Sequence, residues 1–185
     1  MKMRKPLKSR NELIQDLGRI FRANGFDGAT LTLLTKGTGL ERASLYHHFP
    51  KGKSDMAEAV LLQALSDLKF EVVEKLIGEG PPEKRIGQML VAVEKFYNEG
   101  NDICFITIFS LTKVSKKVSD LMNESILLWA RLLENALTEL EVERPREAAQ
   151  QALSSIQGAL ILSNAVNDPR IFKNSLKHLR SQWLK

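Results

Sequence analysis

A short basic segment, residues 42–47, carries the side chains of this sequence that are best suited to binding a charged partner. It contains Arg42, Ser44, Tyr46 and His47. Guanidinium, hydroxyl and imidazole groups donate hydrogen bonds to phosphate oxygens and to base edges. A helix that lies in the major groove of DNA must present side chains of these kinds. The segment therefore predicts a DNA-contacting helix.

Two short helices joined by a glycine turn are expected to position this segment. Leu31 and Leu34 have the spacing of residues that pack inward from a first helix. Residues 38–40, Thr-Gly-Leu, form the turn, and Leu45 and Phe49, four residues apart, anchor the second helix to the same small core. The pattern is that of a helix-turn-helix.

The flanking residues favour a three-helix unit. Ser9 and Glu12 have the spacing of a capping box at the start of a helix that Asn24-Gly25 is expected to end. Thr30 is expected to cap the next helix, whose N-terminus can receive a phosphate. Arg42 is the candidate for a base edge, whereas Tyr46, Lys51 and Lys53 suit phosphates. The predicted DNA-binding residues are Thr30, Arg42, Ser44, Tyr46, His47, Lys51 and Lys53.

Charge is distributed unevenly along the chain of 185 residues, whose formal net charge is +5. Residues 1–53 contain 11 Lys and Arg against 4 Asp and Glu, and residues 54–185 contain 16 against 18. A basic excess at one end is an electrostatic signature of a polyanion-binding region. Residues 1–10 have no apolar face that would insert into a membrane surface, so double-stranded DNA is the expected partner.

Residues 9–60 resemble the DNA-binding domain of TetR-family repressors. The resemblance rests on Asn24-Gly25-Phe26, on Thr38-Gly39-Leu40 and on the run from Ala43 to Phe49 with the lysine-bearing turn after it. The string from Leu45 to Lys53, and Ile103-Cys104 further on, are similar to the LmrA/YxaF-like branch. The family usually has glycine at the position of Ala43 and an acidic residue at that of Leu33, so contacts at these two positions are not carried over.

The remaining chain is expected to be helical, which makes the fold class all-α. Apolar residues recur at helical spacing, and Gly, Pro and Asn-Asp punctuation separates the segments. We predict a helix-turn-helix domain at 1–53 and a helical effector-binding and dimerisation domain at 54–185. The expected helices of the second domain cover 54–77, 83–98, 103–114, 117–140, 145–167 and 171–183.

Small side chains along residues 145–167 allow close helix packing, either within the subunit or between two subunits. The resemblance implies a homodimer in which the last two helices of each subunit form a four-helix bundle. Two recognition helices about 34 to 36 Å apart would then read a pseudo-palindromic operator. The predicted interface comprises Ala152, Ile156, Gly158, Ala159, Leu160, Ser163, Leu176, Leu179 and Trp183.

Apolar side chains in the second domain form either an ordinary core or a ligand pocket, and the resemblance favours a sensor of a small apolar or aromatic effector. Cys104 is interpreted as a buried small hydrophobe, with a redox role as the alternative. The predicted pocket residues are Met89, Val93, Phe96, Cys104, Phe105, Ile108, Phe109, Met122, Trp129 and Leu132.

Nothing in the sequence has the spacing of a catalytic or metal site, and no cofactor is expected. The three histidines are His47, His48 and His178, a single cysteine gives no zinc pattern, and the glycines at 37 and 39 do not form a phosphate-binding loop. No secretory signal or membrane span is readable, so a cytoplasmic location is expected. The sequence thus predicts an effector-released transcriptional repressor, with a helical interaction protein or an effector-independent DNA-binding protein as alternatives.

Overall fold

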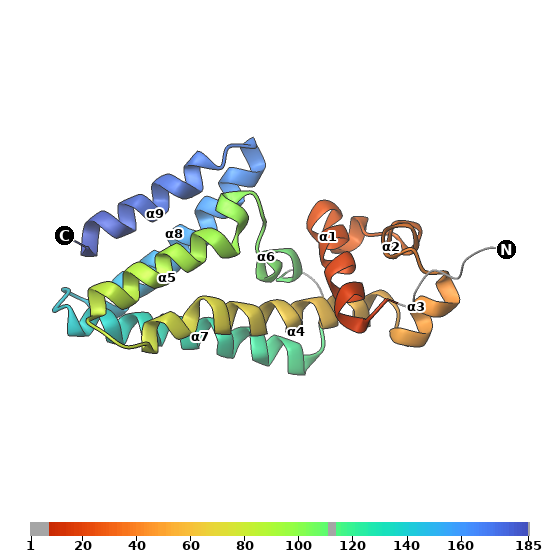
Figure 1. Cartoon of the computed structure of the whole chain (residues 1–185), viewed down its shortest axis with the longest axis horizontal. Coiled ribbons are helices and arrows are strands. Elements are labelled where there is room, and N and C mark those ends of the chain that lie inside the picture. Colours follow the sequence, from red (N-terminus) through yellow and green to blue (C-terminus); the bar gives the residue numbers. More distant parts are fainter. Residues whose placement is uncertain (1–7, 111–113, 185) are drawn as a thin grey trace.

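The computed structural model describes residues 8–110 and 114–184, and every regular element in these ranges is a helix. The all-α fold class is therefore confirmed. Figure 1 shows an elongated molecule, with α1, α2 and α3 at one end and α5, α8 and α9 at the other. The elements are α1 (Arg10–Gly28), α2 (Leu31–Thr38), α3 (Arg42–His48), α4 (Lys53–Glu71), η1 (Val73–Ile77, a 3₁₀ helix), α5 (Pro82–Phe96), η2 (Asn98–Gly100, also 3₁₀), α6 (Phe105–Phe109), α7 (Lys116–Glu139), α8 (Pro145–Val166) and α9 (Arg170–Trp183).

Local capping explains where the first helices begin. The Ser9 hydroxyl accepts from the Glu12 amide at 3.3 Å, and the Glu12 carboxylate accepts from the Ser9 amide at 2.7 Å, so the predicted capping box is confirmed. The Thr30 hydroxyl likewise caps α2, accepting from the Leu33 amide at 3.3 Å. The predicted interruption at Asn24-Gly25 is confirmed, because Gly25 is not helical, although a further short helical stretch follows it. Gly25 adopts a positive φ of 68°, which kinks the helix there, and α1 continues to Gly28.

The prediction of one long helix over residues 54–77 is wrong, because that segment contains a break. The α-helical part, α4, ends at Glu71, and the tighter 3₁₀ helix η1 follows from Val73. Val72, with φ −113° and ψ −61°, lies between them. Val72 and Val73 are consecutive β-branched residues, which lower helix propensity, and both are buried. The helix type therefore changes at two adjacent β-branched residues whose side chains are both buried.

The helix expected at 103–114 is shorter in the structure, where α6 comprises only Phe105–Phe109. Part of that expectation falls on residues 111–113, which lie outside the described residues. The other predicted helices begin and end within two residues of α5, α7, α8 and α9. Strong amphipathic periodicity is the reason that these four were predictable.

The buried side chains form two clusters. The C-terminal cluster joins η1, α5, α7, α8 and α9, and it includes Leu68 of α4. The N-terminal cluster joins α1, α2 and α3 to the first part of α4, and also includes Phe105 and Phe109 of α6 and Val118 of α7. The core of the helix-turn-helix region thus extends beyond residue 53 and incorporates a helix from the second half of the chain.

A buried carboxylate holds the N-terminal segment against the first two helices. Asp16 on α1 is 7% exposed and accepts hydrogen bonds from both Lys8 and Arg19. The Lys8 ammonium also donates to the carbonyl oxygen of Thr38 at the end of α2, at 2.7 Å. Burial by itself would raise the pKa of Asp16, but the hydrogen bonds from Lys8 and Arg19 outweigh it and hold this pKa below its ordinary value.

We expect Asp16→Asn to destabilise the folded chain by about 1 to 3 kcal/mol at neutral pH, because two cations lose a charged acceptor. Because the folded-state pKa of Asp16 is lowered, its contribution is present above the unfolded pKa and lost as pH falls through the folded value. Thermal unfolding measured from pH 7 down to pH 3 should therefore show a smaller acid-induced loss for the variant than for the wild type. The exposed Asp27→Asn is the control, and identical pH profiles for all three proteins would contradict this assignment.

Candidate nucleic-acid interface

Helix α3 has a buried face and an exposed face, as the sequence predicted. Leu45 is fully buried and Phe49, just after the helix, is 1% exposed. The side chains of Arg42, Ser44, Tyr46 and His47 are all exposed. The helix therefore presents guanidinium, hydroxyl and imidazole groups on one outer surface.

The exposed aromatic ring of Tyr46 lies between a cation and a glycine turn. The guanidinium carbon of Arg42 is 5.7 Å from the centroid of the Tyr46 ring. On the other side, a Cβ added to Gly52 would lie 3.3 Å from Cε1 of Tyr46, and Gly52 has a φ of 70°. Only glycine combines that left-handed backbone with the closeness of the ring. Tyr46 is thus supported by the turn that leads into α4.

The two lysines of this turn have different environments. Lys51 is exposed, and its backbone amide donates to the Asp55 carboxylate at 2.7 Å. The Lys53 ammonium donates to the carbonyl oxygen of Phe26 at 2.9 Å and lies 4.5 Å from the centroid of the Phe26 ring. Lys53 therefore fastens the start of α4 to the end of α1. Sequence reasoning missed this role, because its partner is 27 positions away.

Two further exposed groups lie on the helix-turn-helix. Thr30 is exposed at the N-terminus of α2, where its hydroxyl is the cap. Lys36, in the last turn of α2, is exposed as well, although it was not among the predicted DNA-binding residues. Because α2 is short, Lys36 could have been included from its position alone. His48 differs from its neighbour His47 in being half-buried, and its carbonyl oxygen accepts from Arg10 at 3.4 Å.

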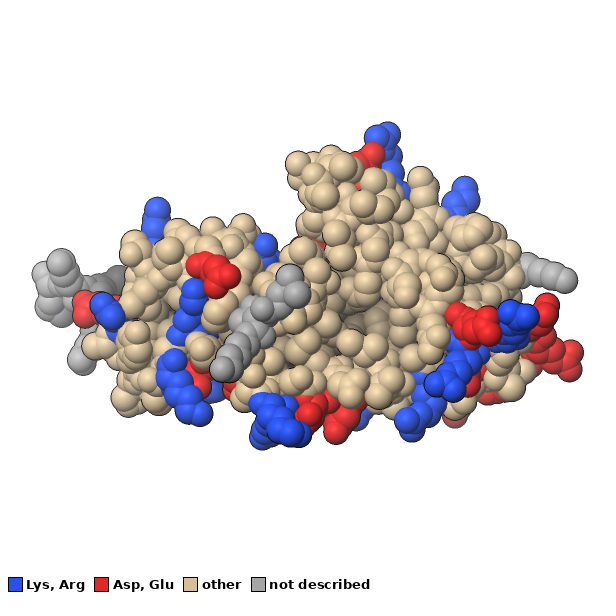
Figure 2. Space-filling model, turned by 180° about the vertical axis from the view of Figure 1, so that it is seen from behind, with Lys and Arg blue, Asp and Glu red and all other residues tan. Residues whose placement is uncertain are grey.

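A largely apolar cavity of about 380 Å³ lies between α6, α7 and α8. We call it the α6–α8 cavity. Trp129 is 3% exposed at its wall, and its indole N–H is buried without an acceptor among the described residues. Figure 2, which shows the molecule from behind, has a hollow in the middle of a broad face without charged side chains. The cavity is lined by Ile106, Thr107, Ser110, Ile126, Trp129, Leu153, Ser154, Gln157 and Ile161.

The structure does not bring the ten predicted pocket residues together around one cavity. Among them, only Trp129 lines the α6–α8 cavity. Phe96 and Phe105 line a second cavity of about 420 Å³ that is bounded by α1, α4, α5 and α6. The others pack in the two cores: Met89, Val93, Cys104 and Leu132 in or against the C-terminal cluster, and Ile108, Phe109 and Met122 in or against the N-terminal cluster.

Cys104 is 4% exposed and accepts a hydrogen bond from the Tyr97 hydroxyl, with 3.5 Å between oxygen and sulfur. Burial, followed by the neighbouring Cys104, raises the pKa of Tyr97 well above its ordinary value. Tyr97 therefore keeps its hydroxyl proton, and its contact with Cys104 lies inside the core. This environment agrees with the interpretation of Cys104 as a buried small hydrophobe.

Most residues of the predicted dimer interface are buried within the subunit, which corrects their assignment to a surface. Their side chains belong to the core between α8, α9 and their neighbours: Ala152, Ile156, Ala159, Leu160, Ser163, Leu176 and Leu179. Of the remaining two, Trp183 is half-buried and Gly158 is half-buried with open space where a Cβ would be. The apolar residues that α8 exposes are instead Ile161, Leu162 and Val166.

Comparison with known proteins agrees with this geometry. Residues 18–60 match the family described as bacterial regulatory proteins, tetR family. The HTH-type transcriptional regulator LmrA of Bacillus subtilis is 24% identical over 161 residues, which cover 84% of this chain and 86% of LmrA. This similarity agrees with the LmrA/YxaF-like resemblance of the sequence.

Two solved structures share the fold over nearly the whole chain. A TetR transcriptional regulator from Legionella pneumophila is 17% identical, with a TM-score of 0.79 over 98% of this chain and 100% of that one. A cysteine variant of the TetR-family regulator CifR, solved with a 26-bp double-strand operator DNA, is also 17% identical, with a TM-score of 0.75 over 97% of this chain and 99% of that one.

An exposed, basic recognition helix on a three-helix unit, followed by a larger helical region, defines a helix-turn-helix DNA-binding regulator. The chain belongs to the TetR family of transcriptional regulators. No helix within residues 8–110 and 114–184 is long and apolar enough to cross a membrane.

Proposed function

We propose that this protein is a repressor that binds a pseudo-palindromic operator as a homodimer and is released by a small apolar or aromatic effector. The observation that carries the proposal is the position of α6. Ile106, Thr107 and Ser110, on or just after α6, line the α6–α8 cavity, while Phe105 and Phe109 are buried in the core of the helix-turn-helix region. One short helix thus connects a ligand-sized cavity to the DNA-binding unit.

For the DNA contacts, we propose that Arg42 reads a base edge. Ser44, Tyr46, His47 and Lys51 share its exposed surface or the turn after it, and we assign them mainly to phosphates. Thr30 is proposed to act through the N-terminus of α2. Because the Lys53 ammonium already has a carbonyl acceptor, we assign the phosphate role of this turn to Lys51 and a positioning role to Lys53.

Arg42→Ala should lower affinity for the operator by about 1 to 3 kcal/mol and relax base preference at one position in each half-site, since it removes a base contact. Lys51→Ala should weaken operator and random DNA alike and reduce the slope of log affinity against log salt by about 1. Fluorescence anisotropy with both DNAs at several salt concentrations measures these effects. Equal losses on both DNAs for Arg42→Ala would exclude it from base recognition.

We propose that dimerisation uses the outer face of α8. That face carries Gly158, Leu162 and Val166; Leu162 is 55% exposed and Val166 is 60% exposed. Exposed apolar residues in a row on one helix face are typical of a surface that a partner covers. Gly158, one turn before Leu162, lets another helix approach closely. A second copy of the chain on this face is consistent with the four-helix bundle that the family resemblance implies.

Gly158→Glu should split the dimer without unfolding the subunit. A side chain here has open space in the monomer, and glutamate favours a helix more than glycine does, so only a partner helix would meet the new charge. Sedimentation should show monomers. Operator affinity should fall at least tenfold, because one protein molecule then contacts a single half-site instead of two. Gly158→Ala is the control and should remain dimeric. A dimeric Gly158→Glu protein would place the interface elsewhere.

We propose that the effector acts through α6 on α1. The ring of Phe109 meets that of Phe21 edge-on, with 5.4 Å between centroids. Arg22 lies with its guanidinium carbon 4.3 Å from the centroid of the Phe105 ring and pairs with Asp102 at 2.8 Å. A ligand that displaces α6 must therefore disturb the packing of α1 and, through it, the spacing of the recognition helices.

The lining of the cavity combines apolar side chains with the hydrogen-bond donors of Thr107, Ser154 and Gln157, which suggests an apolar ligand with one hydrogen-bond acceptor. Quinoline and naphthalene have similar shapes, but only quinoline has an acceptor, so quinoline should bind several-fold more tightly. Quenching of Trp129 in a Trp183→Phe background should report binding, and the Gln157→Leu variant, followed by calorimetry, should show a reduced preference for quinoline. Ligands that bind at Trp129 but leave operator affinity unchanged would show that the cavity binds ligands without controlling DNA binding, which would contradict the proposed effector release.

A further inference from the structure

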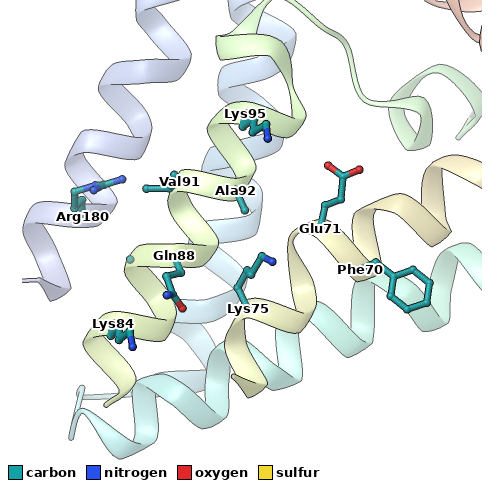
Figure 3. Close-up of a pocket in the computed structure, with 10 residues that line it drawn as sticks. Phe70, Glu71, Lys75, Lys84, Gln88, Val91, Ala92, Lys95 and Arg180 are labelled. Atoms are coloured by element: carbon teal, nitrogen blue, oxygen red, sulfur yellow. The ribbon is translucent and has the colours of Figure 1, made fainter. Parts of the chain in front are cut away.

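A third concave surface lies where the end of α4, η1, α5 and α9 meet, and it borders the cavity of about 420 Å³, with which it shares Glu71 and Lys95. Its volume is about 910 Å³, at the upper end of the roughly 300 to 1,000 Å³ of small-molecule sites. We call it the cationic groove. Figure 3 shows Arg180 of α9 and Val91 of α5 across from one another, with the Lys75 side chain of η1 in the space between α5 and the end of α4. The groove is lined by Phe70, Glu71, Lys75, Lys84, Gly87, Gln88, Val91, Ala92, Lys95 and Arg180.

Positive charge dominates the groove. Lys75, Lys84, Lys95 and Arg180 come from three separate elements, and Glu71 is the single acid among the lining residues. None of the four cations forms an ion pair within residues 8–110 and 114–184.

Neighbouring cations on the same helices do have acidic partners. Arg85, next to Lys84, pairs with Glu139, and Lys173 on α9 pairs with Glu99. These two helices thus carry both paired and unpaired cations, and Lys84, Lys95 and Arg180, unpaired among the described residues, gather at the groove. Four like charges around one concavity create a positive potential that an anion relieves.

The groove also offers an apolar surface between the charges. Val91 is 53% exposed, and Gly87 and Ala92 on the same helix face add little bulk. A side chain as apolar as Val91 gains from being covered, whereas a bare inorganic ion would leave it in water. The lining thus matches a molecule with both an anionic group and an apolar part.

We propose that the cationic groove binds an organic anion that combines a phosphate or several carboxylates with an apolar or aromatic body. The Arg180 guanidinium suits bidentate contact with phosphate or carboxylate oxygens, and the lysines supply mobile point charges around it. The apolar body lies against Val91 and Ala92. This site is separate from the α6–α8 cavity, because the two share no lining residue.

The test uses the full-length protein and 1-naphthyl phosphate as the probe, with 1-naphthol and inorganic phosphate as its two halves. In calorimetry at low salt, 1-naphthyl phosphate should bind at one site per chain and at least tenfold more tightly than either half. The double variant Lys84→Gln/Arg180→Gln should raise its Kd at least tenfold. Protection of Lys75, Lys84 and Lys95 from reductive methylation should locate the ligand independently.

The double variant Lys117→Gln/Lys177→Gln is the matched control, because it removes the same net charge from exposed positions outside the groove. Its Kd should change less than twofold, and both proteins should keep the thermal midpoint of the wild type. An equal increase in Kd for both double variants would show that binding depends on net charge alone and not on the groove. Unchanged binding in the groove variant, or loss only with Ile161→Glu in the α6–α8 cavity, would overturn the proposal.

Discussion

The contact between the Phe109 and Phe21 rings is the interaction on which the arrangement of the two halves depends. Helix α6 has only five residues, too few to be stable as an isolated helix. It forms because Phe105 and Phe109 are buried against α1 and α4, where Phe109 also lies edge-on to Phe26 at 6.3 Å. The short helix therefore gains its stability from the helix-turn-helix region, while Ile106 and Thr107 on its other side line the α6–α8 cavity.

Close approach of α1 to α6 further restricts how the halves can move. A Cβ at Gly18 would lie 3.3 Å from Cζ of Phe105, so a larger residue there would require the Phe105 ring to shift. Arg22 one turn later contacts Phe105 and Asp102, yet its Nε is buried without an acceptor among the described residues. An unpaired buried donor costs free energy that the surrounding contacts offset. The junction between α1 and α6 is therefore close-packed around one buried donor that has no acceptor within the described residues.

Sequence patterns predicted where the helices lie along the chain better than they predicted which helices pack against one another. The helix-turn-helix was readable because its signals, the caps at Ser9 and Thr30 and the Leu45 and Phe49 spacing, are local. Periodicity indicates which side of a helix faces inward, but not which helix it meets. For this reason Phe105 and Trp129, both apolar and buried, were assigned to one pocket although they belong to different cores. The small residues of α8 pose the same problem, because close packing occurs equally well within a subunit and between subunits.

Net charge predicts a partner only after the internal uses of each charge are known. Of the basic residues between 8 and 53, Lys8 and Arg19 bind Asp16, Arg22 binds Asp102, and Arg10 and Lys53 donate to carbonyl oxygens. The remaining cations of that range, which have no acceptor within the described chain, are Lys36, Arg42 and Lys51. In residues 54–185 the net charge is slightly negative, yet four cations without ion pairs among the described residues lie together at the groove. Long-range steering depends on total charge, but recognition depends on the few cations that folding leaves without partners.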